Sequence, residues 1–251
     1  MDKTKIFAHR GASGYAPENT LEAFALAVSQ KADGIELDVQ LTRDGVPVVI
    51  HDETIDRVTS KTGYVKDYTL KELKKLTVME KRFPAYPSSK IPTLEEVLDA
   101  VKASGIWVNI ELKTGIYWYP EIEQKVAQIV QKCDMEQRVI YSSFNHYSIQ
   151  KIKQIVPEAE TAYLYSDVIW NVTDYAKNTK VDGIHPAVYH IKMADFLNEY
   201  IKSGLNVRVW TVNDTTDMKW LIEAGVTAVI TNYPDVAVKI REQRENQNHA
   251  G

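Results

Sequence analysis

Gly34-Ile35-Glu36-Leu37-Asp38-Val39-Gln40-Leu41 is the stretch that decides the fold, an extended apolar run that carries two carboxylates. The apolar part of the run is typical of a parallel strand with both faces buried. Charged groups are costly to bury unless they are paired or bind a metal. Glu36 and Asp38 therefore indicate a functional site at the end of a buried strand.

Similar runs recur along the chain, and helix-like segments separate them. The expected strands are 5–9, 34–41, 106–113, 138–144, 160–164, 183–186, 206–211 and 228–231, and the expected helices are 19–31, 93–104, 120–133, 146–155, 169–179, 191–203, 214–224 and 234–245. Eight β–α units in 251 residues predict a (β/α)8 TIM barrel. A doubly wound sheet is the alternative, but the sequence has no glycine-rich dinucleotide loop.

The extended run 46–51 breaks this alternation after the second strand. Asp44-Gly45 between two extended runs is a strong hairpin signal. If these two residues form the loop, the pairing puts His51 opposite Asp38, on the same face as both carboxylates. A shift of one residue would turn His51 away.

Residues 53–91 have neither a clean strand nor a clean helix pattern. A structureless loop of that length is rare in a compact barrel. We therefore expect a small insertion after the second strand and its hairpin, with its own packing, over the barrel mouth. The TIM-barrel domain then covers residues 1–245, and the polar tail 246–251 is expected to fray.

The composition excludes some functions and leaves others open. The net charge of −4 implies no broad basic face for nucleic acid. Cys133 is the single cysteine, so an intramolecular disulfide is impossible and a reducing compartment is expected. No apolar run has the length of a signal peptide or of a membrane span. These features favour a cytoplasmic enzyme, unless a leader has been removed, and leave the oligomeric state open.

Charged residues also lie at the ends of other strands, and all of them should meet on one face. The C-terminal ends of barrel strands converge on the catalytic face. Glu36, Asp38 and Glu111 would repel one another there unless a cation lay between them, and oxygen ligands favour Mg²⁺ or Ca²⁺ over Zn²⁺. The full set of candidate residues is His9, Arg10, Glu36, Asp38, His51, Glu111 and Lys113.

The remaining members of this set suit an anionic substrate. Arg10 and Lys113 can hold an anion, because arginine binds two phosphate oxygens at once and lysine adds a positive charge. His9 and His51 can act as an acid and a base. The alternative is a structural ion-pair cluster with histidines that satisfy core hydrogen bonds. Seven such groups at strand ends favour a site for a divalent cation and a phosphodiester.

Several motifs closely resemble the glycerophosphodiester phosphodiesterase family. The resemblance covers residues 5–235 and rests on His9-Arg10-Gly11, Pro17-Glu18-Asn19-Thr20, the run from Ile35 to Gly45, the run from Pro47 to Asp52, Glu111-Leu112-Lys113 and the run from Val209 to Asn213. It implies a metal-dependent hydrolase of glycerol and lipid metabolism that releases sn-glycerol 3-phosphate and an alcohol. It also implies an insertion after the His-Asp motif, which matches 53–91.

The resemblance also implies a role for each site residue. Glu36, Asp38 and Glu111 would bind one divalent cation, Ca²⁺ or Mg²⁺. Arg10 and Lys113 would bind phosphate, and His9 and His51 would be the acid–base pair. In the family, a glycerol hydroxyl is thought to attack phosphorus, and water then opens the cyclic phosphate. That scheme makes His9 the base and His51 the acid of the leaving group, although the sequence does not order the two.

The last candidate and two rival functions depend on the walls of the site. Trp210 could form an apolar wall for the glycerol moiety or pack at the barrel rim. A non-catalytic phosphate-binding barrel is one rival, but it would not need both histidines. A lysophospholipase D-like enzyme is the other, and it would need an apolar channel. The loops offer only 117–119 and scattered aromatic residues in the insertion, which favours small water-soluble diesters as substrates.

Overall fold

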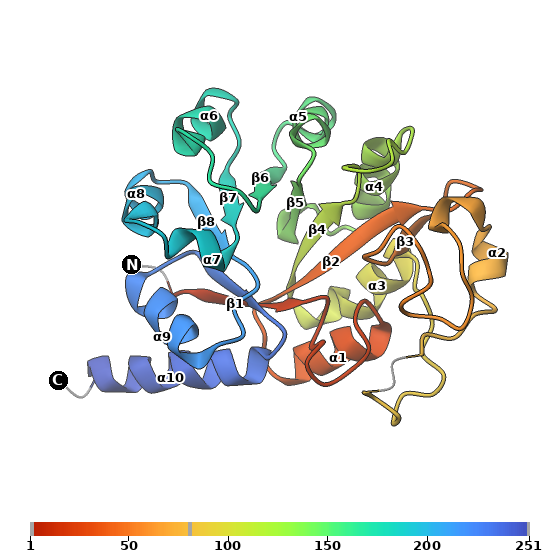
Figure 1. Cartoon of the computed structure of the whole chain (residues 1–251), viewed down its shortest axis with the longest axis horizontal. Coiled ribbons are helices and arrows are strands. Elements are labelled where there is room, and N and C mark those ends of the chain that lie inside the picture. The colour runs from red at the N-terminus through yellow and green to blue at the C-terminus, as the bar shows by residue number, and fades with distance from the viewer. Residues whose placement is uncertain (1–2, 80–81, 250–251) are drawn as a thin grey trace.

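The computed structural model describes residues 3–79 and 82–249. Eight parallel strands close into a ring, and the helices surround it (Figure 1). In ring order these strands are β1 (Lys5–His9), β2 (Gly34–Leu41), β4 (Trp107–Leu112), β5 (Val139–Ser143), β6 (Glu160–Tyr165), β7 (Gly183–Pro186), β8 (Asn206–Val209) and β9 (Ala228–Thr231), which pairs with β1. The predicted (β/α)8 barrel is confirmed.

The helices follow the predicted segments closely. They are α1 (Leu21–Ser29), α3 (Leu94–Val101), α4 (Ile122–Lys132), α5 (His146–Ile155), α6 (Val172–Asn178), α7 (Val188–Ile191), α8 (Phe196–Lys202), α9 (Thr215–Ala224) and α10 (Pro234–His249). The predicted helix 191–203 is thus replaced by α7 and α8. The last helix extends beyond the expected end at 245, and residues 250 and 251 of the expected tail lie outside the described residues. Among the residues described, no helix is both long and apolar enough to cross a membrane.

Polar residues at the helix starts explain where the helices begin. The side chain of Thr20 accepts a hydrogen bond from the backbone of Ala23 at the start of α1. Thr93 and Glu96 form a reciprocal capping box at the start of α3. Such caps satisfy backbone N–H groups that have no partner within the helix. They fix the point at which the chain turns from a loop into a barrel helix.

The hairpin after β2 differs from its predicted register by one residue. Strand β3 (Pro47–Val49) is antiparallel to β2, with Val49 opposite Val39. Asp38 therefore lies opposite Ile50, and the backbone N–H of Ile50 donates to the Asp38 carbonyl over 3.0 Å. The prediction that His51 pairs with Asp38 is wrong.

A three-residue loop causes this shift. The Thr42 backbone N–H donates to the Val46 carbonyl over 3.1 Å, so residues 43–45 form the loop. Gly45 closes it with a φ of +75°, a conformation that glycine adopts without steric cost. The hydroxyl of Thr42 donates to Asp44 and accepts from the backbone of Val46, which stabilises the longer loop.

His51 reaches the predicted place by a different route. β1 and β3 pair with the same edge of β2, one after the other. The pairing of β1 ends with His9 opposite Glu36, and that of β3 begins with Val49 opposite Val39. The chain leaves β3 at Ile50, next to the end of β1. His9 and His51 therefore approach each other along β2 from opposite directions.

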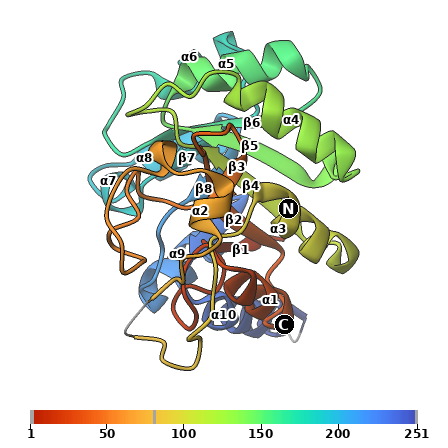
Figure 2. The same cartoon turned by 90° about the vertical axis from the view of Figure 1, so that its right-hand side faces the viewer.

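The insertion has a small apolar core of its own. It contains a 3₁₀ turn, η1 (Val65–Asp67), and a short helix, α2 (Leu70–Leu73). Figures 1 and 2 show α2 beside β3. Its buried apolar residues form one cluster with two residues of the 47–50 segment: Val48, Ile50, Ile55, Val58, Val65, Leu73, Val78 and Ile91. The segment returns to its starting point, where the Val49 backbone N–H donates to the Pro92 carbonyl over 2.8 Å.

We expect Gly34→Ala to destabilise the barrel. A Cβ atom on Gly34 would lie 2.4 Å from the ring of Phe7, which is fully buried within the barrel. Overpacking of this kind costs about 2 kcal/mol of unfolding free energy. Urea unfolding measures the loss, and Gly115→Ala is the control, since a Cβ atom there has open space. Equal unfolding midpoints for the two variants would contradict the expectation.

Candidate active site

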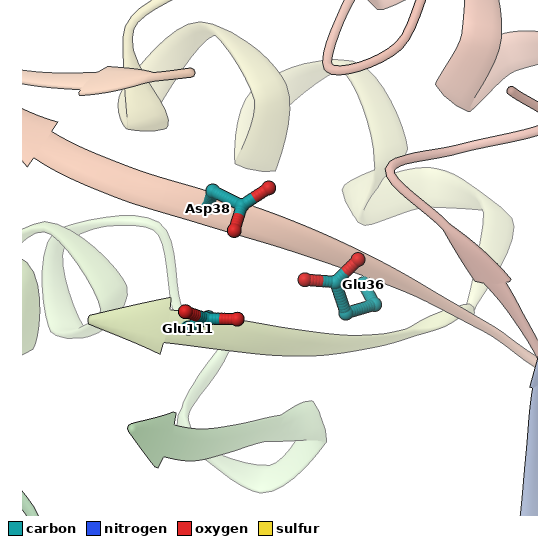
Figure 3. A group of neighbouring side chains, drawn as sticks. All are labelled: Glu36, Asp38 and Glu111. Carbon is teal, nitrogen blue, oxygen red and sulfur yellow. The ribbon is translucent and has the colours of Figure 1, made fainter. Parts of the chain in front are cut away.

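Three buried carboxylates face one another on the neighbouring strands β2 and β4. Glu36 and Asp38 lie two residues apart on β2 and point the same way, and Glu111 pairs in register with Asp38 from β4 (Figure 3). One ligand oxygen from each carboxylate can be chosen so that all three lie within 4.8 Å of one another. The sequence-predicted trio is thus brought together on one face of the barrel.

Burial of these carboxylates in mutual contact shifts their pKa values. Desolvation raises the pKa of Glu36 well above its usual value, and the neighbouring charges of Asp38 and Glu111 raise it further. Desolvation also raises the pKa of Glu111. For Asp38, burial opposes ionisation, but the charges of Arg10 and Lys113 and the hydrogen bond from Asn19 are among the contributions that together outweigh it and lower the pKa. Oxygen Oδ1 of Asp38 is buried and has no hydrogen-bond partner. The trio has the properties of a cation site.

Arg10 and Lys113 place two positive charges beside this trio. Arg10 has a φ of +55°, and its backbone N–H donates to Glu36 over 2.9 Å. Its guanidinium Nη1 donates to Glu18 over 2.9 Å, and Nε lies 3.4 Å from Asp38. Lys113 Nζ lies 3.1 Å from Glu111 Oε1. Both cations are thus oriented by carboxylates beside the trio.

His9 is held by a neutral amide. Its Nδ1 lies 2.8 Å from Oδ1 of Asn232, and its Nε2 lies 4.0 Å from Glu36 Oε2. An amide oxygen only accepts, so Nδ1 carries the proton and Nε2 keeps a free lone pair toward the carboxylates. Desolvation by burial, followed by the charge of Arg10, lowers the pKa of His9 to about 4. The imidazole is therefore neutral at neutral pH.

His51 is held by a carboxylate instead. Its Nδ1 lies 2.7 Å from Oδ1 of Asp52. Hydrogen bonds from Arg57 hold the pKa of Asp52 well below its usual value, against the opposing effect of burial. The carboxylate oxygen accepts the N–H of His51 Nδ1 and so fixes the orientation of the ring. The two histidines therefore differ in the group that holds Nδ1, a neutral amide for His9 and a carboxylate for His51.

A pocket of about 180 Å³ joins these groups to an apolar wall. It is lined by His9, Arg10, Glu36, His51, Asn109, Glu111, Phe144, Leu164, Trp210 and Ile230. The ring of Trp210 packs edge-on against Phe144 at 5.5 Å between centroids, and its Nε1 donates to the His185 carbonyl over 2.7 Å. Asp38 and Lys113 do not line the pocket themselves but contact Arg10 and Glu111, which do. All eight predicted residues therefore lie together.

The sequence reading missed other residues of the site. Asn109 lies two residues before Glu111 on the same face of β4, and Asn232 follows β9 directly, so the strand-end rule could have found both. Glu18 and Asn19 were not missed, since they belong to the motif at residues 17–20 noted in the sequence: Glu18 contacts Arg10, and Asn19 donates to Asp38 over 2.8 Å. Arg57 had no recognisable signal, because its partners lie in separate segments.

The comparisons with known proteins agree with this geometry. The model of the glycerophosphoryl diester phosphodiesterase family matches residues 9–236. A glycerophosphodiester phosphodiesterase of Caldanaerobacter subterraneus subsp. tengcongensis is 42% identical over 238 residues, which cover 95% of this chain and 98% of the relative. A glycerophosphodiester phosphodiesterase of Bacillus altitudinis is 44% identical over 246 residues, covering 96% and 99% of the two chains.

Solved structures give the same result. A phosphodiesterase of Oleispira antarctica, in complex with the product sn-glycerol-3-phosphate, is 28% identical with a TM-score of 0.88 and coverage of 96% of this chain and 97% of that chain. A glycerophosphodiester phosphodiesterase of Agrobacterium tumefaciens is 30% identical with a TM-score of 0.80, covering 94% and 99%. The chain therefore belongs to the glycerophosphoryl diester phosphodiesterase family, as its motifs predicted.

Proposed function

We propose that the chain hydrolyses glycerophosphodiesters to sn-glycerol 3-phosphate and an alcohol, using two histidines and one divalent cation. The pocket carries the proposal, because two differently held imidazoles and the Arg10 guanidinium line it with Glu36 and Glu111, and Asp38 lies beside those two carboxylates. The family match and the product bound to the Oleispira antarctica protein support the same reaction.

Glu36, Asp38 and Glu111 are the proposed ligands of Ca²⁺ or Mg²⁺. Oxygen ligands of Ca²⁺ lie at about 2.3–2.6 Å, so two of them are at most about 5 Å apart. The carboxylate oxygens, within 4.8 Å of one another, meet this limit, and the unpartnered Asp38 Oδ1 would gain a partner. When bound, the ion offsets the carboxylate charge and withdraws electrons from a phosphoryl oxygen.

Arg10 and Lys113 are the proposed phosphate-binding residues. Glu18 holds the Arg10 guanidinium in place, and Glu111 holds the Lys113 ammonium. Charge-assisted hydrogen bonds to phosphate oxygens are strong and depend on such orientation. Trp210 is proposed to form, with Phe144, the wall against which the glycerol carbons lie.

The partners of the two histidines support an order for the proton transfers. We assign His9 as the base that takes the proton from the glycerol hydroxyl as that oxygen attacks phosphorus. His51 gives its proton to the leaving alcohol oxygen as the P–O bond breaks, and a cyclic phosphate forms. In the second step His51 takes a proton from the water whose oxygen attacks phosphorus, and His9 returns its proton to the glycerol oxygen as the ring P–O bond breaks. Both residues end in their starting states.

The insertion and the cellular location complete the proposal. We propose one catalytic domain, residues 1–245, with residues 53–91 over part of the barrel mouth. In support, Arg57 binds Glu18 in the β1–α1 loop, and Tyr64 packs edge-on against Tyr117 in the β4–α4 loop at 5.7 Å. A cytoplasmic location fits the single cysteine, Cys133, which is free and buried.

A coupled assay for glycerol 3-phosphate tests the proposed function. The purified chain is incubated with Ca²⁺ or Mg²⁺ and with glycerophosphocholine, -ethanolamine, -glycerol or -inositol. We expect release of glycerol 3-phosphate from at least one of these diesters, at a rate that depends on the head group. Binding of the diesters without release under any metal condition would instead support a non-catalytic phosphate-binding barrel.

A further inference from the structure

The guanidinium of Arg57 joins two carboxylates that come from distant parts of the chain. Its Nε and Nη2 donate to Asp52 over 2.7 and 3.0 Å. Its Nη1 and Nη2 donate to Glu18 over 2.7 and 2.8 Å. Arginine presents its N–H groups in a rigid planar fork, so two bidentate pairs fix both carboxylates relative to each other.

Each of these carboxylates holds a different group of the active site. Asp52 accepts from Nδ1 of His51 over 2.7 Å, and Glu18 accepts from Nη1 of Arg10 over 2.9 Å. A continuous series of charged contacts therefore runs from His51 through Asp52, Arg57 and Glu18 to Arg10. Asp52 lies between Arg57 and the proposed acid, and Glu18 lies between Arg57 and the proposed phosphate ligand.

We propose that Arg57 is a positioning residue for catalysis, which keeps the Asp52–His51 pair aimed at the leaving-group oxygen. This inference rests on the proposed function, in which His51 is the acid. Without Arg57, the Asp52 carboxylate loses both of its guanidinium hydrogen bonds and can rotate away from Nδ1 of His51. The His51 ring then loses the partner that fixes its orientation.

The solvent exposure of the Arg57 contacts distinguishes a positioning role from a stabilising one. The side chain of Arg57 is 45% exposed and that of Asp52 is 30% exposed, whereas Glu18 is 10% exposed but keeps its hydrogen bond from Arg10 when Arg57 is removed. Exposed ion pairs contribute little to the free energy of unfolding, because solvent screens them and side-chain entropy opposes them. The fold should therefore survive the loss of Arg57, while the geometry of His51 should not.

The test compares two leaving groups on the same glycerol phosphate. Glycerophosphocholine releases choline, a poor leaving group that needs a proton from the acid. The p-nitrophenyl ester of glycerol 3-phosphate releases p-nitrophenolate, which leaves without protonation. General acid catalysis contributes about 10²–10⁴-fold to rates, so a misplaced acid should affect only the first substrate.

We expect Arg57→Ala to lower kcat for glycerophosphocholine by about thirtyfold, a part of the full acid contribution. The kcat for the p-nitrophenyl ester should change less than about fivefold. Arg57→Lys, which keeps the charge but not the planar fork, should recover little of the loss, and added ethylguanidinium should restore activity to Arg57→Ala. Equal losses on both substrates, or no loss on either, would overturn the positioning role.

Two controls make the outcome decisive. Arg43→Ala breaks another arginine contact to the insertion, with Glu72 at 3.1 Å, and should leave both rates and the melting temperature near those of the wild type. His51→Ala should show the same substrate dependence as Arg57→Ala, but with a larger loss. If His51→Ala affects both substrates equally, the proposed acid role fails. If His51→Ala slows mainly glycerophosphocholine and Arg57→Ala does not, only the inference about Arg57 fails.

Discussion

Removal of divalent metal with EDTA should lower the rate of glycerol 3-phosphate release by at least about a thousandfold, because the ion supplies several kcal/mol of charge stabilisation. The buried trio of Glu36, Asp38 and Glu111 has mutually repelling charges and one unpartnered oxygen. Without a cation, the site would present excess negative charge to an anionic phosphodiester. The coupled assay after dialysis against EDTA measures the loss, and added Ca²⁺ or Mg²⁺ should restore activity.

Thermal unfolding gives a second measurement that does not depend on turnover. A ligand that binds only the folded state raises the melting temperature by mass action. We expect the metal that restores activity to raise the melting temperature of the wild type and not that of Asp38→Asn. Asp134→Asn is the control, since Asp134 is an exposed residue that pairs with Lys102 and does not belong to the trio. Full activity in the presence of chelator would eliminate the three-carboxylate metal site.

His9→Ala and His51→Ala should each lower turnover of glycerophosphocholine by at least about a hundredfold, the usual contribution of a general acid or base. His9 presents a free Nε2 toward the carboxylates, and His51 is paired with an ionised Asp52. Steady-state kinetics with the coupled assay measures both losses. His146→Ala controls for the removal of an imidazole elsewhere, since His146 stacks on Tyr163 outside the pocket.

The two histidine variants should also differ from each other. A base that activates the glycerol hydroxyl is needed whatever the leaving group, so His9→Ala should slow the p-nitrophenyl ester as much as glycerophosphocholine. His51→Ala should slow mainly glycerophosphocholine. The reverse pattern would exchange the two roles, and near wild-type activity in either variant would remove that residue from the reaction.

The barrel could be predicted from sequence because each strand is a short, mostly apolar run and a helix-like segment follows it. The charged site residues were found for the same reason, since Glu36 and Glu111 stand out among buried apolar neighbours. The hairpin register could not be found in this way. Asp44-Gly45 fits a two-residue or a three-residue loop, and the hydrogen bonds of the Thr42 hydroxyl decide between them in the folded chain.

The contacts that support the site residues could not be predicted from the sequence, for a related reason. Arg57 lies 39 positions from Glu18, and Asn232 lies 223 positions from His9. Sequence spacing gives no information on pairs that only tertiary folding brings together. Such residues look like ordinary polar loop residues until the ends of the strands are placed around one pocket.

The insertion departs from and rejoins the barrel at one place, beside Val49 and Pro92. Its two ends are therefore held together by the hairpin, whatever the length of chain between them. The entropy of closing such a loop rises only slowly as residues are added. The segment between these two ends could thus gain or lose residues at little entropic cost, as long as its apolar cluster with Ile50 is kept. Changes in the length of this segment are therefore compatible with an unchanged arrangement of the pocket residues, because none of the described residues in 53–91 lines the pocket.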